Sequence, residues 1–285
     1  MDLTSPKTVK AIFSKYEARP SKGLGQNFLI DKNVLEKIVE SADMKPDDAI
    51  LEVGPGVGTL TQALAEKAGK VIAVEKDKTM CEILKNVLAV QGVKNVQIVN
   101  ADILKTNISS FKLQASRYKV VANIPYYLTS PLIRKFLESK NPPSDMILML
   151  QKEVAQRICA KPPSMSLLAI SVQFYAEPKI ISYVSKNCFW PAPKVDSATI
   201  KITPSPELGE VHSARDSADF FAVVKAGFSQ PRKQLVGNLS KSLKLDRERT
   251  EDWLKKNNIK PTQRAETLSV DDWKKLTASN PKTID

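Results

Sequence analysis

Two kinds of hydrophobic pattern alternate along the first half of the chain. Four short apolar runs, rich in Val and Ile, have the length and composition of buried strands: 49–53, 71–75, 96–99 and 118–122. The segments 33–42 and 78–90 instead carry their apolar side chains on one helical stripe. We interpret the strands as parts of an open parallel sheet, in which ligands bind where the strands end.

The second half of the chain continues this pattern and then changes. We expect a fifth strand at 145–151, a helix at 152–159, and strand-like segments at 167–175, 180–184 and 197–202. A linker that contains Pro and Gly, 203–213, then precedes segments with a helical pattern: 220–228, 233–243, 247–257 and 270–276. These changes divide the chain into three parts: a basic N-terminal arm at 1–24, a larger α/β domain at 25–205, and a small helical domain at 206–285.

A glycine-rich loop, Gly54-Pro55-Gly56-Val57-Gly58, follows the first of these strands directly, and a helix begins near Thr59. Such a loop lets a nucleotide approach the backbone and face the N–H groups of the helix. A dinucleotide fingerprint would require glycine at position 59, whereas the G-x-G-x-G spacing fits an S-adenosylmethionine cofactor better than NAD. A lone glycine loop is a weak signal, but its position between a strand and a helix strengthens it.

Two acidic residues stand at neighbouring strand ends. Glu75 follows Gly54 by 21 residues, and a carboxylate at that spacing accepts hydrogen bonds from the ribose hydroxyls of a nucleotide. Asp102 follows the next strand, where it is placed to accept from an adenine amino group while Ile103 packs on the ring. The alternatives are a solvated strand end for Glu75 and a helix-cap or turn residue for Asp102.

The strand at 118–122 ends in Asn123-Ile124-Pro125-Tyr126, and Pro125 prevents the sheet from continuing. An amide side chain, backbone carbonyls and an aromatic ring are therefore presented together. This trio suits attack by an exocyclic amine, such as adenine N6, on an electrophilic methyl group. The Asn123 side-chain oxygen and the Ile124 or Pro125 carbonyl would bind the two amine hydrogens, and Tyr126 would stack on the base. The alternative is an ordinary Asn-x-Pro turn with a core tyrosine.

A second candidate for base contacts is the loop 189–197, which begins with Phe189 and Trp190 and is stiffened by prolines. An aromatic ring on such a loop can stack on a flipped-out base. The alternative is an aromatic plug that fills space under the loop.

The charge of the chain indicates its class of partner. The 43 Lys and Arg residues against 31 Asp and Glu residues give a net charge of +12, which favours nucleic acid or an anionic membrane surface. The segment 220–245 contains five basic residues and no acidic one: Lys225, Arg232, Lys233, Lys241 and Lys244. These residues form either a grip on phosphates or a solvated basic face. The arm 1–24 either contacts nucleic acid or is a frayed terminus.

Other features narrow the class of protein. Cys81, Cys159 and Cys188 form no C-x-x-C pair, which favours reduced thiols in a cytoplasmic protein over a disulfide framework or zinc site. The single histidine, His212, argues against a Ser–His dyad or a His–metal site, and we expect no metal. No apolar run reaches the ~18 residues of a membrane span, and a signal-peptide core is absent.

In order and spacing, the motifs resemble one enzyme family. They are Gly25–Leu29, Leu51–Gly58, Glu75, Asp102, Asn123–Tyr126, Phe189–Ser197 and Phe228–Leu235. The chain is similar, from about residue 20 to its C-terminus, to the ribosomal RNA small-subunit adenine dimethyltransferases of the KsgA type. Ile124 stands where Leu is frequent in that family, and Tyr127-Leu128 replace the usual Asn-Ile in the wall of the acceptor pocket.

The resemblance implies a Rossmann-like S-adenosylmethionine-dependent methyltransferase sheet with helices on both faces and a small all-helical C-terminal domain. It also implies methylation of N6 of two adjacent adenosines near the 3′ end of small-subunit rRNA, within the pre-ribosomal small subunit. We expect the protein to be a monomer. Carried over by motif, the cofactor-binding residues would be Asn27, Leu29, Gly54, Gly56, Glu75, Asp102 and Asn123. Asn123, Pro125 and Tyr126 would orient the amine, and Phe189 would stack on the target base.

Three rival interpretations remain. A large-subunit adenine methyltransferase of the macrolide-resistance type shares the Asn-Ile-Pro-Tyr stretch, but Ser130-Pro131-Leu132 and the basic C-terminal motif favour the small-subunit type. A non-catalytic RNA-binding assembly factor would have no reason to keep Glu75, Asn123 and Tyr126. A NAD-dependent dehydrogenase is disfavoured by the glycine spacing and by the shortage of proton donors.

Overall fold

The structure is a computed structural model that describes residues 1–114, 117–205 and 214–281. His212 and most of the predicted linker lie outside the described residues. The chain forms two compact units, one of residues 1–155 and 178–204 and the other of residues 156–177 and 205–285. The predicted domain boundaries at residues 24 and 205 stay predictions.

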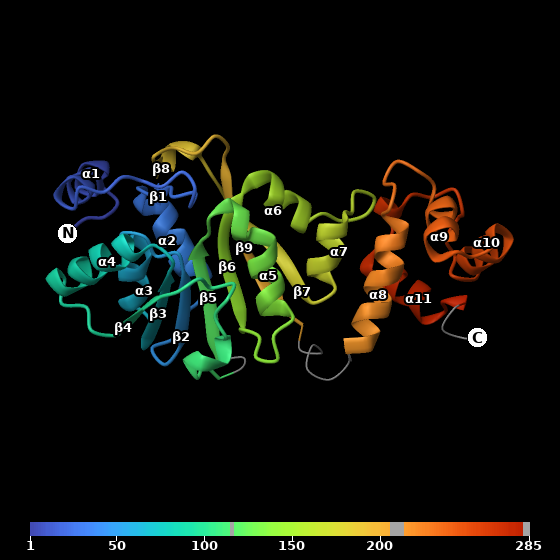
Figure 1. Ribbon diagram of the computed structural model, residues 1–285, viewed down its shortest axis with the longest axis horizontal. Coiled ribbons are helices and arrows are strands. Elements are labelled where there is room, and N and C mark those ends of the chain that lie inside the picture. Colours follow the sequence, from blue (N-terminus) through green and yellow to red (C-terminus); the bar gives the residue numbers. More distant parts are fainter. Residues whose placement is uncertain (115–116, 206–213, 282–285) are drawn as a thin grey trace. The chain divides into compact units, whose positions relative to one another are not determined.

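The first unit is built on a seven-stranded sheet with the strand order β4-β3-β2-β5-β6-β9-β7 (Figure 1). In chain order the strands are β2 (Ala49–Val53), β3 (Lys70–Glu75), β4 (Val96–Asn100), β5 (Tyr118–Asn123), β6 (Asp145–Gln151), β7 (Ala176–Val184) and β9 (Ser197–Pro204). Neighbouring strands from β4 to β6 are parallel, and β9 runs antiparallel to β6. Since β3 and β5 lie on opposite sides of β2, the strand order reverses at β2, and ligands bind at such a point.

Both faces of the sheet are covered, because successive residues of β5 and β6 are fully buried. The helices that lie along the sheet are α2 (Lys32–Ser41), α3 (Thr59–Ala65), α4 (Lys78–Val90) and α5 (Thr129–Leu137) (Figure 1). Helix α6 (Lys152–Ile158) follows β6 directly. The side chains of Ile38 in α2 and Leu64 in α3 share a core cluster with Ile50 and Val121. Asp31 caps α2 by accepting the Val34 N–H at 3.0 Å. The five strands predicted at 49–53, 71–75, 96–99, 118–122 and 145–151 are confirmed, and all five pair in parallel.

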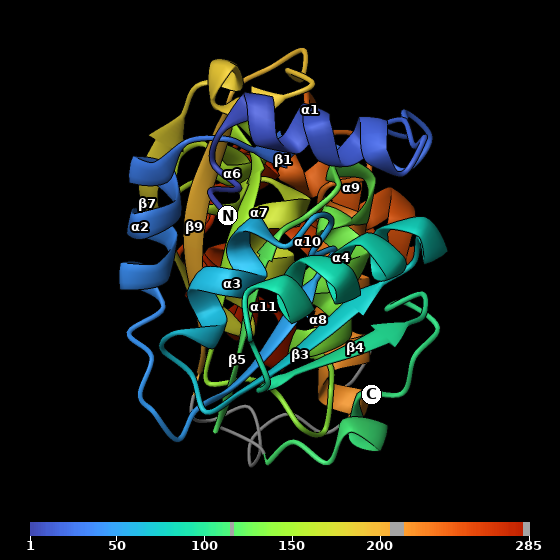
Figure 2. The ribbon, with the colours of Figure 1, turned by 90° about the vertical axis from the view of Figure 1, so that its left-hand side faces the viewer.

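The N-terminal segment is folded, so a frayed terminus is the wrong alternative. Helix α1 (Pro6–Lys15) buries Val9, Ile12 and Phe13. The Phe13 ring lies 5.1 Å from Phe28 and 5.3 Å from Trp190, measured between ring centroids. These partners belong to the short antiparallel pair β1 (Phe28–Leu29) and β8 (Phe189–Trp190). Figure 2 shows α1 beside β1.

The second unit is helical, with α7 (Leu167–Gln173), α8 (Ala214–Gly227), α9 (Leu235–Leu243), α10 (Arg247–Lys256) and α11 (Val270–Ala278). The strand predicted at 167–175 is wrong, because Ser166 caps a helix by accepting the Ala169 N–H at 3.2 Å. A short apolar run does not distinguish a strand from a buried helix. The Phe174 ring instead stacks on Phe220 at 4.1 Å within this unit.

Candidate active site

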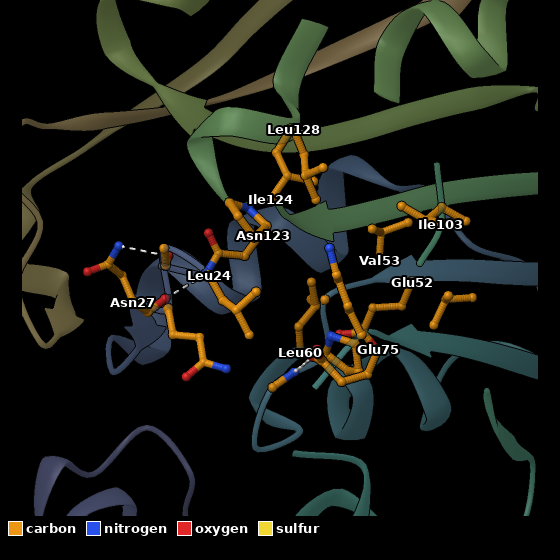
Figure 3. A pocket seen from close by; sticks show the side chains of 18 of the residues that line it. Leu24, Asn27, Glu52, Val53, Leu60, Glu75, Ile103, Asn123, Ile124 and Leu128 are labelled. Atoms are coloured by element: carbon orange, nitrogen blue, oxygen red, sulfur yellow. Dashed lines mark hydrogen bonds between the residues drawn. The ribbon is translucent and has the colours of Figure 1, made fainter. Parts of the chain in front are cut away.

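One pocket opens at the carboxyl ends of β2, β3 and β5 (Figure 3). It encloses about 1040 Å³ of space between the atoms, a volume that includes the open solvent at its mouth. All the predicted cofactor and acceptor residues line it: Asn27, Leu29, Gly54, Gly56, Glu75, Asp102, Asn123, Pro125, Tyr126 and Phe189. Glu75, Asp102 and Asn123 meet because the strand ends of a parallel sheet share an edge. Asn27 and Phe189, which are 162 positions apart, are brought together by the antiparallel pair of β1 and β8.

The glycine loop forms one wall of the pocket in a conformation that favours glycine. Gly54, Gly56 and Gly58 all have positive φ, at 71°, 56° and 99°. A Cβ atom on Gly56 would lie 2.8 Å from the Phe28 ring, so this position has no room for a side chain. The Gly56 N–H donates to Glu75 Oε2 at 3.2 Å, which ties the loop to the end of β3.

Glu75 is nearly buried at the floor of the pocket. Its Oε1 accepts the Asp77 N–H at 2.8 Å, in addition to the Gly56 contact at Oε2. Burial raises the pKa of this carboxyl, and the two backbone hydrogen bonds oppose the rise. A carboxylate offers about four acceptor positions, so acceptor capacity remains for a ligand.

Asp102 is already engaged by a lysine that the sequence analysis missed. Lys76 Nζ lies 3.1 Å from Asp102 Oδ2, and the Leu104 N–H donates to Oδ1 at 3.0 Å. Partial burial works to raise the pKa of Asp102, but the lysine and the backbone N–H outweigh it and lower the pKa. The predicted turn role of Asp102 is therefore present, and a ligand amine at Oδ2 would compete with Lys76.

The Asn123 side chain is oriented by a hydrogen bond to the backbone of Asn27. Its Nδ2 donates to the Asn27 carbonyl at 3.1 Å, which leaves Oδ1 as an acceptor (Figure 3). The Ile124 N–H donates to the Met149 carbonyl at 3.2 Å, and the Pro125 carbonyl accepts the Leu128 N–H at 2.9 Å. The stretch is thus held at Asn123 and at the two residues that follow it, as a site that aims a reacting group requires.

Tyr126 and Phe189 lie at the acceptor end of the pocket. The Tyr126 hydroxyl meets Ser197 Oγ at 3.0 Å, and burial raises the pKa of the tyrosine. Phe189 is 4% exposed and belongs to the core cluster that contains Leu29 and Val121. Phe189 therefore fills space under its loop, as the alternative interpretation expected, and it also lines the pocket.

A third carboxyl in the pocket, Glu52, was not predicted from the sequence. It is 1% exposed, and its Oε2 has no hydrogen-bond partner within the described ranges of the chain. Burial raises its pKa to about 8, and the nearby Glu75 adds to this effect. The available signal was an acidic residue inside the apolar run 49–53, which is costly to bury unless it serves a purpose.

The five predicted RNA-binding residues are exposed in the second unit. Lys233 and Lys241 line one hollow together with Arg247, which the sequence analysis did not single out. Among the described residues, no three His, Cys, Asp or Glu side chains cluster as a metal site would need, and no described helix is long and apolar enough to cross a membrane.

Comparison with known proteins agrees with this geometry. The sequence profile of the family described as "Ribosomal RNA adenine dimethylase" matches residues 3–280. A protein of Alkaliphilus metalliredigens named "Ribosomal RNA small subunit methyltransferase A" is 44% identical over 281 residues, covering 96% of both chains. One of the same name from Dehalococcoides mccartyi is 44% identical over 276 residues, covering 95% of this chain and 93% of its own.

Solved structures extend the similarity to the fold. A dimethyladenosine transferase from Plasmodium falciparum superposes with a TM-score of 0.73 at 26% identity, covering 87% of this chain and 95% of its own. The 23S rRNA methyltransferase ErmE superposes with a TM-score of 0.72 at 26% identity, covering 89% and 99%. The match over nearly the whole length, with the predicted residues gathered in one pocket, places the chain in the ribosomal RNA adenine dimethylase family.

Proposed function

We propose that the protein transfers methyl groups from S-adenosylmethionine to N6 of two adjacent adenosines near the 3′ end of small-subunit rRNA. The product is N6,N6-dimethyladenosine. The observation that carries the proposal is the fixed amide of Asn123, whose Oδ1 is left as an acceptor in the pocket that also contains the glycine loop and Glu75.

The residues present fit the cofactor. Glu75 has acceptor capacity for the ribose hydroxyls, and Asp102 with Ile103 would hold the adenine once Lys76 releases Oδ2. Gly54 and Gly56 would let the remainder of the cofactor approach the backbone, because neither carries a side chain. Asn27, Leu29 and Asn123 complete the wall of the same pocket. When bound, the cofactor supplies a methyl group on a sulfonium, which is already activated for displacement.

The acceptor amine is a poor nucleophile, since its lone pair is delocalised into the adenine ring. Asn123 Oδ1 and the Ile124 carbonyl would accept its two hydrogens and so aim the lone pair at the methyl group. We favour the Ile124 carbonyl over that of Pro125, because the Pro125 carbonyl already accepts the Leu128 N–H. Tyr126 would stack on the base, and Phe189, on the neighbouring loop, would also stack on it.

In the methyl transfer itself, the N6–carbon bond forms as the carbon–sulfur bond breaks, and the N6 proton leaves to solvent or to a nearby carbonyl. Positioning supplies most of the rate, so a strong general base is not required.

The RNA is held outside the pocket by basic side chains. Lys225, Arg232, Lys233, Lys241 and Lys244 would contact phosphates, since all five are exposed in the helical unit. The partner we propose is the pre-ribosomal small subunit, which a monomer would methylate in the cytoplasm. The relatives with 44% identity carry the small-subunit name, which favours this substrate over the large-subunit rRNA of ErmE.

The test is incubation of the protein with labelled S-adenosylmethionine and unmethylated small or large ribosomal subunits, followed by mass spectrometry of the rRNA nucleosides. We expect labelled N6,N6-dimethyladenosine from the small subunit. Label only in the large subunit, or in neither, would contradict the proposal.

A further inference from the structure

An exposed aromatic residue lies outside the pocket, on the edge strand of the sheet. Tyr183 stands near the end of β7, and 56% of the residue is exposed. Burial alternates along β7, so Tyr183 shares its outward face with Lys179 and Ile181.

The exposed ring is held in a defined position. Nζ of Lys152, the first residue of α6, lies 5.3 Å from the centroid of the Tyr183 ring. This distance is within the range of a cation–π interaction. A ring that stays more than half exposed while a cation orders it is preorganised for a flat partner, because little conformational entropy is lost on stacking.

Tyr183 lies at the same edge of the sheet as the acceptor end of the pocket. The Tyr126 hydroxyl contacts Ser197, the first residue of β9, and Ser197 pairs with Gln151 at the end of β6. Lys152 follows directly, and its N–H donates to the Asp196 carbonyl at 3.0 Å. A short chain of contacts therefore leads from the acceptor tyrosine to the lysine on Tyr183.

The end of β7 reaches the same place. The Lys186 N–H, two residues beyond β7, donates to Asp196 Oδ1 at 3.0 Å. Lys186 and Lys194 are exposed on the loop that joins β7 to β9, so two further cations accompany Lys152 at this edge. A base-sized aromatic surface flanked by cations matches the two parts of a nucleotide, a flat base and an anionic phosphate.

We propose that Tyr183 is a stacking platform for the base of the nucleotide next to the adenosine that occupies the pocket. Lys152, Lys186 and Lys194 contact the phosphates of the same single strand. This role rests on the proposed function, because it requires a single-stranded RNA to enter the pocket at Tyr126. Since the two target adenosines are adjacent, the platform holds one of them while the other is being methylated.

The test uses an RNA hairpin whose single-stranded loop contains one adenine beside fluorescent 2-aminopurine, which has no N6 amine and so leaves the adenine as the base that enters the pocket. Stacking on an aromatic ring quenches this base, so the wild-type protein is expected to quench it on binding. Tyr183→Leu should abolish the quenching and weaken RNA binding roughly ten-fold, within the range for loss of one stacked base. Tyr183→Trp should keep both, because it keeps an aromatic face.

Two comparisons make the result specific. Ile181→Ala alters the same strand face without removing a ring and should leave quenching and affinity as in the wild type. S-adenosylmethionine affinity, measured by calorimetry, should be equal in all variants and reports that the fold is intact. Three results would overturn the platform. The wild type does not quench the base, Tyr183→Leu quenches it as strongly as the wild type, or Ile181→Ala loses as much quenching and RNA affinity as Tyr183→Leu. If the wild type still dimethylates small-subunit rRNA in that case, the proposed function stands without it.

Discussion

Replacing Glu52 with glutamine is expected to stabilise the protein at neutral and alkaline pH but not in acid. Burial raises the pKa of Glu52 in the folded protein to about 8, against an ordinary value of 4.5. Between these values the unfolded chain has released a proton that the folded protein still holds, so the free energy of unfolding falls as the pH rises. Below pH 4.5 both states are protonated and there is no loss, and above pH 8 the loss is complete.

The magnitude follows from the width of this pH window. Each unit of pH between the two pKa values lowers the free energy of unfolding by about 1.4 kcal/mol. The whole window therefore corresponds to roughly 5 kcal/mol, and less than 1 kcal/mol of it is reached at pH 5. Glutamine has nearly the same volume and no titrating proton, so Glu52→Gln removes the loss without opening a cavity.

The assay is urea unfolding of wild type and Glu52→Gln, without cofactor, at each pH unit from 5 to 9. The difference in free energy of unfolding should grow steadily in favour of Glu52→Gln up to about pH 8 and then level off. Glu66→Gln, at an exposed position after α3, is the matched control for removal of a carboxyl. Stability curves of wild type and Glu52→Gln that run parallel across this range would refute the assignment of a neutral buried carboxyl.

Three further variants test other parts of the molecule. Glu75→Ala should weaken S-adenosylmethionine binding roughly ten- to a hundred-fold in calorimetry, because hydrogen bonds to a charged group are lost; unchanged affinity in a folded protein would exclude the ribose role. Arg232→Ala combined with Lys233→Ala should lower RNA affinity and flatten its salt dependence by about 0.9 or somewhat less per phosphate contact; an unchanged slope would mean a solvated face only. Phe13→Ala should lower the free energy of unfolding by roughly 3–5 kcal/mol, since its ring packs between two others; a loss under 1 kcal/mol would contradict the role of α1 in the core.

The sequence predicted the pocket well because parallel strands bring their carboxyl ends to one edge. Glu75, Asp102 and Asn123 each follow an apolar run, so their meeting required only that the strands belong to one sheet. The glycine loop was recognisable because its glycines have a characteristic spacing and because it lies between a predicted strand and a predicted helix. Resemblance to a family added Asn27, which no pattern of apolar residues would have indicated.

Other features depend on contacts between side chains that are distant in sequence. Two examples are the ion pair of Lys76 with Asp102 and the unpaired oxygen of Glu52. Both depend on how deeply these side chains lie in the pocket, which the pattern of apolar residues in the sequence does not predict. The N-terminal helix was not predicted to be part of the core, because the segment is rich in lysine and has few apolar residues. Its apolar residues are recognisable as core only from the packing of Phe13 against the rings of Phe28 and Trp190. The strand predicted at 167–175 failed because the capping role of Ser166 was overlooked.

The most direct test of the account is the methylation rate of Asn123→Ala at saturating S-adenosylmethionine, followed by mass spectrometry of nucleosides from unmethylated small subunits. If Asn123 Oδ1 aims the N6 lone pair, its contribution is made mainly in the transition state. The rate should then fall roughly a hundred-fold or more, while RNA affinity changes far less because most of it comes from phosphate contacts. Formation of N6,N6-dimethyladenosine by Asn123→Ala at the wild-type rate would contradict the account.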